Sequence, residues 1–310
     1  MIRSLTPFDI VRLANFRNSE WLVRRGLARE RIPRSVFSDL PPFKLKSFLS
    51  DRVTERRRET IFGLINEGDI MGLASACQRN GSTSWGVRQL AISNGGEKGI
   101  GDLLSMLGSH AGRHGAERLF LLLPDEARFV DVIRRSGFLL GTALEVYTLV
   151  GRDALVGGTQ AKALRLRLAA DDYSLYRLYN ASTPLDVREG TGMTLQQWVD
   201  AQELRGKRTR ELVVEEGGSI WAWVRLDSEL GCVRVQSMVH PLWKGDLGGL
   251  VAFVLTQVNS RRVLWEVPTH QGSLRLVLER VGFQMSGTYR LMVKLLVVQV
   301  KESAQVAAVA

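Results

Sequence analysis

The sequence predicts an α/β (α+β) fold that occurs twice in one chain of 310 residues. A set of short motifs recurs in the same order in both halves, and short runs of alternating apolar residues lie between them. The length suits two domains of about 150 residues, and the apolar fraction of 45% suits two cores. We therefore expect domains over 1–150 and 163–300, a glycine-containing linker over 151–162 and a frayed tail over 301–310.

The clearest repeat joins a proline, a helical stretch and a Gly-Phe pair. It runs from Pro124 to Phe138 in the first half and from Pro268 to Phe283 in the second, with spacings of 14 and 15 residues. A Gly-Thr pair and an apolar strand follow each copy. Matching segments further upstream are 67–72 and 216–222, 87–92 and 233–239, and 98–104 and 244–250. Because these matches keep one order in both halves, we interpret them as a duplicated domain.

Hydrophobic periodicity and turn residues predict similar elements in each half. In the first half we expect a strand at 2–5, helices at 8–17 and 43–57, strands at 60–66, 70–78 and 83–92, a helix at 100–113, a strand at 118–123, a helix at 127–136 and a final pair of strands. In the second half we expect a strand at 163–168, helices ending near 180 and at 195–204, strands at 210–215, 220–227 and 232–239, a helix at 247–259, a strand at 263–267, a helix at 274–281 and a long strand ending near 300. Thr194 is the expected N-cap of the helix at 195–204.

Positive charge gathers at the start of the chain. The net charge is +10, and residues 1–58 hold 14 Lys and Arg against 6 Asp and Glu. Most of the excess comes from Arg24, Arg25, Arg29, Arg31, Arg34, Arg56, Arg57 and Arg58. We expect a solvated basic surface here, and we keep two alternatives: binding of nucleic acid, and attraction of an anionic cofactor or acidic substrate.

Several features predict a cytoplasmic protein without a membrane segment or a metal. No apolar run approaches the roughly 18–20 residues of a membrane span, and the N-terminus lacks the apolar region of a secretory signal. Cys77 and Cys232 fall in predicted strands of different halves, which favours buried thiols. His110 and His114 lie four apart on a predicted helix, but no third ligand is evident.

The order of elements resembles that of the GNAT superfamily of acyl-CoA-dependent N-acyltransferases. Each half is similar to a whole domain of that family, so the resemblance spans nearly the full chain. The stretch 239–245 is similar to the family's strand end that leads into its pyrophosphate loop, and the Gly-Phe pairs ending at Phe138 and Phe283 are similar to the pair that ends its last helix. The resemblance implies two tandem domains, each with a mixed, mostly antiparallel central sheet flanked by helices. It also implies acetyl-CoA, or another acyl-CoA, as co-substrate.

The resemblance places the acyl-CoA at a glycine-rich turn that opens a helix. Glycines let the backbone approach a pyrophosphate, and the helix N-terminus presents unsatisfied N–H groups. Gly99 and Gly101 match the family's glycines in the first half, whereas Leu247 replaces a glycine and Asp246 adds negative charge in the second. We therefore expect the first half to hold the cofactor. The expected site residues are Leu90, Ala91, Ile92, Lys98, Gly99, Ile100, Gly101 and Asp102, with a weaker second site at Val239, Lys244, Gly245, Gly248 and Gly249.

The sequence assigns no catalytic residue. Many family members use a tyrosine four residues before the Gly-Phe pair as general acid, and here those positions are Ile133 and Leu278. Tyr147, Glu145 and Glu266 are acidic or phenolic strand residues that we interpret as locally paired. Four tryptophans cluster in the second half, and they pack in a core or line an aromatic acceptor pocket: Trp221, Trp223, Trp243 and Trp265.

The resemblance leaves two functions open. The first is transfer of an acetyl group to a primary amine of a small molecule or peptide, by a monomer or a homodimer. The second is a non-catalytic, GNAT-like scaffold that senses a ligand or binds a protein partner. The missing tyrosines favour the second function, and the glycine-rich turn favours the first.

Overall fold

The computed structural model describes residues 1–9, 12–13, 16, 19–23, 59–125, 129–150, 164–229, 231–258, 260 and 262–297. The expected linker over 151–162, the tail over 301–310 and the helix at 43–57 lie outside these residues. So does the arginine-rich part of the basic segment, from Arg24 to Arg58.

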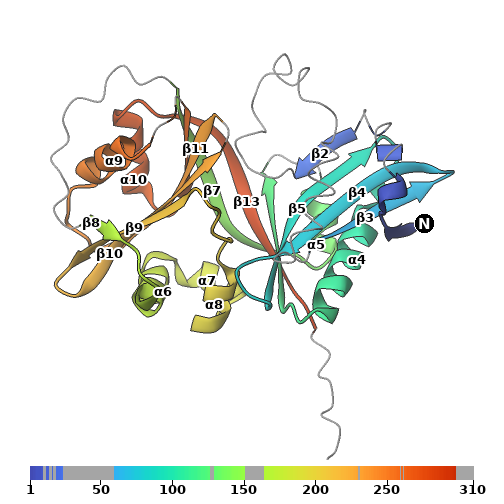
Figure 1. The fold of residues 1–310 in the computed structure, drawn as a ribbon, viewed down its shortest axis with the longest axis horizontal. Helices are drawn as coiled ribbons and strands as arrows, with labels where there is room; N and C mark the ends of the chain where they lie inside the picture. The colour runs from blue at the N-terminus through green and yellow to red at the C-terminus, as the bar shows by residue number, and fades with distance from the viewer. Residues whose placement is uncertain are drawn as a thin grey trace, which may run out of the picture.

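The strands of the described residues form one 13-stranded sheet that runs through both halves (Figure 1). The first half contributes β1 (Ile2–Ser4), β2 (Ser19–Val23), β3 (Glu59–Asn66), β4 (Asp69–Gln78), β5 (Ser84–Ser93), β6 (Arg118–Pro124) and β7 (Leu139–Val150). The second half contributes β8 (Leu164–Leu166), β9 (Thr209–Glu216), β10 (Ser219–Glu229), β11 (Cys232–Val239), β12 (Arg262–Pro268) and β13 (Gln284–Leu295). The pairs β5–β6 and β11–β12 are parallel, and the other pairs are antiparallel. The expected mixed, mostly antiparallel sheet is therefore confirmed.

The two halves exchange their last strands. The strand order is β1-β3-β4-β5-β6-β13-β7-β12-β11-β10-β9-β8, so β13 lies between β6 and β7, and β7 lies between β13 and β12. The exchange is symmetric: Pro124 at the end of β6 faces Tyr289 of β13, and Pro268 at the end of β12 faces Leu144 of β7. Figure 1 shows β7 and β13 crossing the middle of the molecule.

This exchange explains one difference from the sequence-based expectation. Instead of a final pair of strands in the first half, the structure has the single 12-residue strand β7. The neighbour that a pair would have supplied comes from the second half as β13, whose own 12 residues pair with both β6 and β7. Because the pairing crosses between the halves, sequence periodicity within one half cannot reveal it.

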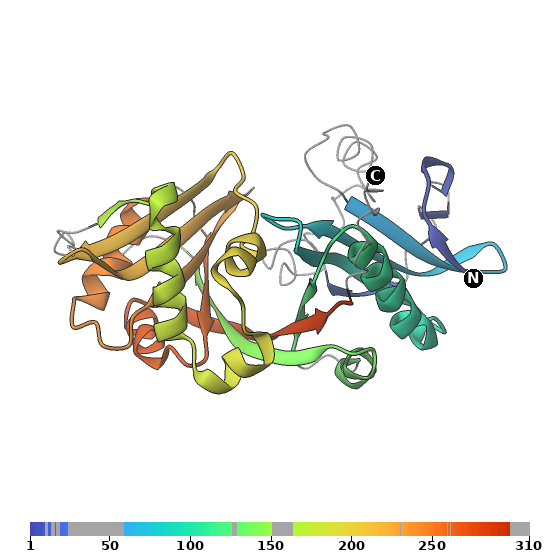
Figure 2. The same cartoon turned by 90° about the horizontal axis from the view of Figure 1, so that it is seen from below.

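Helices cover both faces of the sheet. The helices that follow parallel strands are α4 (Ile100–Arg113), α5 (Val130–Arg135), α9 (Leu247–Thr256) and α10 (Gly272–Arg280), and the second half adds α6 (Asp172–Ser182), α7 (Leu185–Thr191) and α8 (Leu195–Ala201). Along β10, Ala222 and Val224 pack in the core beneath α9 and α10, whereas Trp223 packs with residues of α6 and α8. Period-two alternation therefore places the two helix pairs on opposite faces, and Figure 2 shows α6 lying across its face.

Both Gly-Phe pairs end a helix in the same way. Gly137 has φ +89° and Gly282 has φ +98°, values that a residue with a Cβ rarely adopts. Each glycine reverses the chain after its helix and directs the following phenylalanine into a core: Phe138 in the first half and Phe283 in the second. The duplicated motif is thus a duplicated helix stop.

The structure confirms some of the other expected elements and differs from others. The helix at 100–113 and the strand at 232–239 have the predicted bounds, and Thr194 Oγ1 accepts a hydrogen bond from the Gln197 N–H as the expected cap. The chain at the start of the helix expected over 8–17 is a 3-10 turn, Pro7–Asp9. The sequence analysis did not predict β2 or α7. None of the helices in the described residues is long and apolar enough to cross a membrane.

Candidate functional site

The glycines of the first-half turn pack against the protein's own chain. After β5, a 3-10 turn at Glu97–Gly99 leads directly into α4. A Cβ at Gly99 would clash with the side chain of Leu64, and a Cβ at Gly96 would clash with the carbonyl oxygen of Met71. The Gly99 N–H donates to the Gly96 carbonyl at 2.9 Å, so this turn satisfies part of its own backbone. Close packing alone accounts for both glycines, and Lys98 is exposed to solvent.

The strand edge beside that turn is occupied by another strand. The strands β5 and β6 pair only from Ser84 to Gly86 and then diverge. Farther along β5, the strand β2 pairs with Leu90, Ala91 and Ile92 on the edge that β6 has left. These three residues are almost fully buried. The backbone edge that the sequence analysis assigned to a cofactor thus pairs with the chain itself.

The equivalent edge in the second half is open. The strands β11 and β12 pair from Val233 to Gln236, and Gln236 faces Glu266 at the last position. Beyond it, Ser237, Met238 and Val239 pair with β10 on one side, while their other edge has no paired strand among the described residues. The two halves therefore share the divergence of their parallel strands and differ in what fills it.

The start of α9 also differs from the start of α4. Asp246 is the N-cap, and the first helical bond runs from the Leu250 N–H to the Asp246 carbonyl at 3.0 Å. By helix geometry the N–H groups of Leu247, Gly248 and Gly249 precede the first helical bond, and the Asp246 side chain does not cap them. The first turn carries no acidic residue, whereas the first turn of α4 carries the exposed Asp102. Free N–H groups and the helix dipole suit an anion at this end of α9, whereas the exposed carboxylate of Asp246 opposes one.

A cavity of about 240 Å³ lies at the opening between β11 and β12. Both halves line it. The first half contributes Arg79, Phe120 and Thr142 among others, and the second contributes residues of α6, α8, β10, β11 and β12. Its polar groups include Gln236 and Glu266 from the last paired position. The cavity thus combines an apolar wall with a few buried polar groups, which is typical of small-molecule sites.

Glu266 is the buried acid of this cavity. It is only 3% exposed, and its Oε2 accepts a 2.7 Å hydrogen bond from Gln236 Nε2. Arg234 Nη1 donates to the other carboxylate oxygen at 3.4 Å. Burial raises the pKa of Glu266 above its ordinary range, and the charge of Arg234 offsets this effect only in part. A buried carboxyl with a raised pKa is suited to accept a proton near neutral pH.

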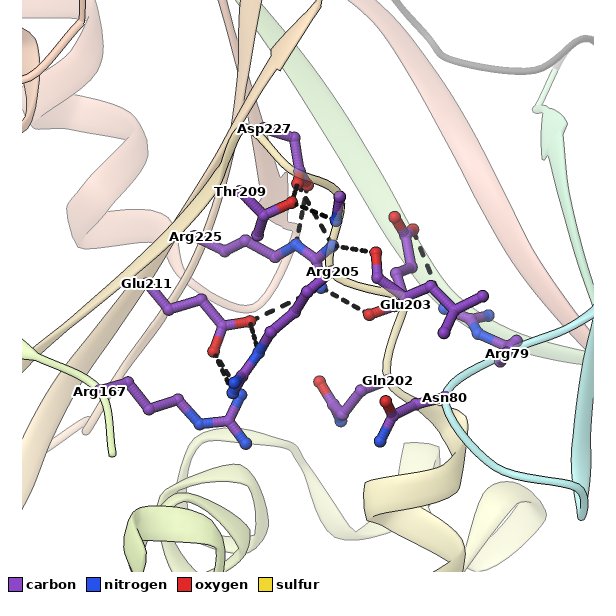
Figure 3. Close-up of polar contacts among 12 residues, drawn as sticks. Arg79, Asn80, Arg167, Gln202, Glu203, Arg205, Thr209, Glu211, Arg225 and Asp227 are labelled. Atoms are coloured by element: carbon purple, nitrogen blue, oxygen red, sulfur yellow. Dashed lines mark hydrogen bonds and ion pairs between the residues drawn. The ribbon is translucent and has the colours of Figure 1, made fainter. Parts of the chain in front are cut away.

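A network of ion pairs holds the segment after α8 against the sheet (Figure 3). Arg225 donates to the backbone carbonyls of Glu203 and Leu204, both at 2.8 Å, and to Asp227 Oδ2 at 2.8 Å. The Glu203 carboxylate is bound by Arg234. Burial opposes ionisation of Glu203, but Arg234 outweighs that effect and holds its pKa well below the usual range. The network fixes one wall of the cavity.

Hydrogen bonds between the halves hold α8, which lines the cavity, against the first half. Thr83 Oγ1 donates to Asp200 Oδ2 at 2.7 Å, and the Gly81 N–H donates to the Asp200 carbonyl at 3.1 Å. Arg118 Nη2 donates to the Gly192 carbonyl at 2.8 Å. Asp200 is 7% exposed, so the junction is desolvated as well as bonded. Because both halves are tied at this point, the cavity between them has fixed walls.

The other residues considered from the sequence lie elsewhere. The Tyr147 hydroxyl is bonded to Glu145 at 3.0 Å and to Glu279 at 3.2 Å, and Tyr147 packs in the second-half core beneath α9 and α10. Burial, reinforced by both carboxylates, raises its pKa. Ile133 and Leu278 are fully buried core residues. None of these five residues lines the cavity.

The tryptophans divide between the two interpretations made from the sequence. Trp223 lines the cavity, as an acceptor pocket requires. Trp265 packs on the other face of the sheet, 6.0 Å from Phe283 between ring centroids, and its Nε1 donates to Ser237 Oγ at 3.0 Å. The rings of His110 and His114 lie 4.3 Å apart, and no group of three metal-binding side chains occurs in the described part of the chain.

Sequence reasoning missed two polar residues of the cavity, Gln236 and Arg79, and interpreted a third, Glu266, as a locally paired strand residue. Glu266 carries the only signal that was visible, because it is an acid inside the apolar run from Val263 to Val267. Gln236 becomes relevant only through its register opposite Glu266. Arg79 belongs to the other half, so its place in the cavity depends on how the halves meet.

Comparisons with known proteins agree with this fold. No family model matches the sequence, and no curated protein matches it. Among solved structures, a GCN5-related N-acetyltransferase from Sphaerobacter thermophilus matches with a TM-score of 0.55 and 14% identity, over 95% of each chain. A tandem GNAT protein from the clavulanic acid biosynthesis pathway matches with a TM-score of 0.51 and 14% identity, over 95% of this chain and 98% of that one. A putative acetyltransferase from Pyrococcus horikoshii matches with a TM-score of 0.51 and 12% identity, over 97% and 91%.

These likenesses extend over both halves of the chain, as the duplicated motifs and the repeated strand divergence do. At 12–14% identity they establish the architecture. The chain therefore has the fold of the GNAT N-acetyltransferases in a tandem arrangement.

Proposed function

We propose that the protein is an acyl-CoA-dependent N-acyltransferase whose working site lies in the second half. The observation that carries this proposal is the open edge of β11 at Ser237–Val239, which lies beside a cavity that contains the buried acid Glu266. The proposal places the acyl-CoA in the half that the turn residues alone disfavoured. It leaves the first half as a structural partner that supplies cavity wall.

The second half fits an acyl-CoA better than the first on three grounds. Its strand edge has free backbone groups that can hydrogen-bond the amides of a pantetheine arm. The first turn of α9 offers free N–H groups to a pyrophosphate, and Lys244 is exposed nearby in the sequence. In the first half, β2 pairs with the equivalent edge and Leu64 and Met71 fill the space beside the turn glycines.

Glu266 is the proposed general base. An amine acceptor arrives mainly as an ammonium ion and must lose a proton before its nitrogen can attack a carbonyl carbon. The carboxylate of Glu266 takes that proton inside the cavity, and Gln236 holds the carboxylate in place through its 2.7 Å hydrogen bond. When bound, the acyl-CoA supplies the activated thioester carbonyl and a thiol leaving group. No tyrosine of the second-half helices stands at the family's acid position, so we assign no general acid.

Coenzyme A release provides the test. The wild-type protein is mixed with acetyl-CoA and a panel of primary amines, and calorimetry measures the binding of acetyl-CoA separately. We expect binding by the wild type, release with at least one amine, and loss of release in Glu266→Gln with binding retained. Absence of acetyl-CoA binding at millimolar ligand would contradict the proposal. Binding without release from any amine would favour the non-catalytic scaffold.

A further inference from the structure

Arg79 is a cation in the wall of the cavity, and its side chain makes few polar contacts. It follows β4 directly, and its guanidinium carbon lies 4.7 Å from the centroid of the Phe120 ring. A guanidinium has five N–H donors. Within the described residues its side chain makes no hydrogen bond; its buried Nε has no partner, which is also true of Arg234. The nearest carboxylate is that of Glu203, at 3.8 Å from Nη2.

The neighbouring arginines show how a purely structural arginine is held here. Arg225 donates to two backbone carbonyls and to Asp227. Arg234 binds Glu203, Asp227 and Glu266. Because Glu203 is already engaged by Arg234, it compensates Arg79 only weakly, and burial lowers the pKa of Arg79. The Arg79 side chain is 20% exposed and its ion pair with Glu203 is long, so its N–H donors are available to an acceptor that the chain itself does not provide.

Three charged residues line the cavity: Arg79 from the first half, and Glu203 and Glu266 from the second. A ligand in the cavity can therefore meet opposite charges from different halves, at Arg79 and at Glu266. Between them the lining is apolar and aromatic, with Phe120, Trp198 and Trp223 among its residues. Its volume of about 240 Å³ falls below the roughly 300–1,000 Å³ of pockets for drug-sized ligands, so it suits a smaller molecule.

We propose that the acceptor is a small zwitterion, an α-amino acid with an apolar or aromatic side chain. Its carboxylate pairs with the guanidinium of Arg79, its ammonium lies beside Glu266, and its side chain contacts the aromatic wall. Arginine matches a carboxylate with two parallel N–H donors, which gives the contact direction as well as charge. This inference rests on the proposed function, because it names the substrate class of the same site.

The test measures binding without any acyl-CoA. The wild-type protein is titrated calorimetrically with L-phenylalanine, L-leucine, 2-phenylethylamine, which lacks the carboxylate, and 3-phenylpropionate, which lacks the ammonium. We expect L-phenylalanine to bind about tenfold or more tighter than either analogue, because each analogue lacks one of its two charged groups. Equal affinity for L-phenylalanine and 2-phenylethylamine overturns the inference, and so does absence of binding by both amino acids.

Variants locate the contact. Arg79→Gln should lower the affinity for L-phenylalanine to that for 2-phenylethylamine, and should leave the affinity for 2-phenylethylamine within about twofold. Arg79→Lys keeps a charge beside Glu203 but loses the two-donor fork, so we expect an intermediate affinity. The control Arg134→Gln removes an exposed arginine of α5, outside the cavity, and should change nothing. An equal loss for every probe in Arg79→Gln overturns the inference, since a purely structural role predicts that pattern.

The outcome separates this inference from the proposed function. Acetyl-CoA binding is measured on the same preparations. Retained acetyl-CoA binding with no preference for a zwitterion overturns the substrate class alone. A zwitterion preference that depends on Arg79, without acetyl-CoA binding, supports the substrate class and contradicts the acyltransferase.

Discussion

Gln236 donates a 2.7 Å hydrogen bond to Glu266 at the last paired position of β11 and β12. Both side chains reach the cavity from the point where the two parallel strands diverge. A glutamine beside a buried carboxyl holds it in one orientation without neutralising it. This pair therefore gives the second half a buried base at the position where its sheet opens.

Replacing Glu266 by Gln should reduce the rate of acyl transfer about 100-fold or more, because the variant keeps the shape and loses the proton acceptor. Acetyl-CoA affinity should stay within about twofold, since the Glu266 carboxyl lies in the cavity that we propose for the amine acceptor. Steady-state kinetics and calorimetry check the two parts. Glu279→Gln, an exposed residue at the end of α10, is the matched control and should keep the wild-type rate.

The acid limb of the rate profile should report Glu266. Its pKa is raised by burial, so activity should fall as the pH drops through a value above the ordinary range of a glutamate. The charged groups that shift the pKa of Glu266 are Arg234, Glu203 and Asp227. The variant Gln236→Leu leaves all three unchanged. Gln236→Leu removes a hydrogen bond that lowers this pKa, so the limb should move to higher pH. An unchanged limb would argue against Glu266 as the base.

The same shift predicts how stability depends on pH. A carboxyl whose pKa is higher in the folded protein favours folding when it is protonated, and that contribution is lost as the pH rises through the folded pKa. The glutamine of Glu266→Gln does not ionise, so this variant lacks the loss of stability at higher pH. Arg234 still has Glu203 and Asp227 as partners in the variant. The free energy of unfolding of Glu266→Gln, relative to wild type, should therefore increase from pH 4 to pH 8. Urea titrations at a series of pH values measure it.

The junction between the halves should depend on Asp200. Its carboxylate accepts a hydrogen bond from the Thr83 hydroxyl and is buried where the two halves meet. Asp200→Ala should lower the free energy of unfolding by about 1–3 kcal/mol, because it leaves the partly buried hydroxyl and N–H of Thr83 without an acceptor. Asp131→Ala, at a carboxylate whose side chain is 83% exposed, should change it far less. Equal effects would show that the junction contributes little.

The exchanged strands predict how the halves behave apart. A fragment of residues 1–150 lacks β13 and exposes the edge of β6, and a fragment of residues 163–310 lacks β7. Each should aggregate or unfold alone, since an open hydrophobic strand edge promotes association. Mixed during refolding, the fragments should form a 1:1 complex with cooperative unfolding, measured by sedimentation and circular dichroism. Two separately stable monomers would contradict the importance of the exchange.

The sequence predicts the parts of this fold that are local. The Gly-Phe helix stops at Gly137 and Gly282 depend on a backbone conformation that glycine alone adopts readily, so they are visible as a motif. The single strand β7 and the pairing of β2 depend on contacts across the chain, and periodicity carries no information about such partners. For this reason the glycine-rich turn predicted the acyl-CoA site in the first half, although β2 pairs with the strand edge beside that turn.

The site was harder to predict than the fold. Glu266 stands out in an apolar strand, but a buried acid pairs with a local partner more often than it takes part in catalysis. Arg79 gives no signal at all, because it enters the cavity only through the junction of two halves. The tandem arrangement follows from repetition within the sequence, whereas the cavity follows from the way the repeats are joined.

The central proposal, that acyl-CoA binds at α9 and not at α4, can be tested with one matched pair of variants. Gly101 and Gly248 are the second residues of these equivalent helices. A Cβ at Gly101 meets the hydroxyl oxygen of Ser136 at 3.1 Å, and a Cβ at Gly248 meets a carboxylate oxygen of Asp246 at 3.2 Å. A glutamate at either position should be tolerated by the fold, because it is favourable near a helix N-terminus. It would repel a pyrophosphate bound there.

Calorimetric titration with acetyl-CoA is the deciding measurement. Gly248→Glu should weaken binding about tenfold or more, while Gly248→Gln, which adds the same bulk without charge, should weaken it less. Gly101→Glu should bind as the wild type does. The reverse pattern, with binding lost in Gly101→Glu and retained in Gly248→Glu, would place the acyl-CoA in the first half and contradict the proposal.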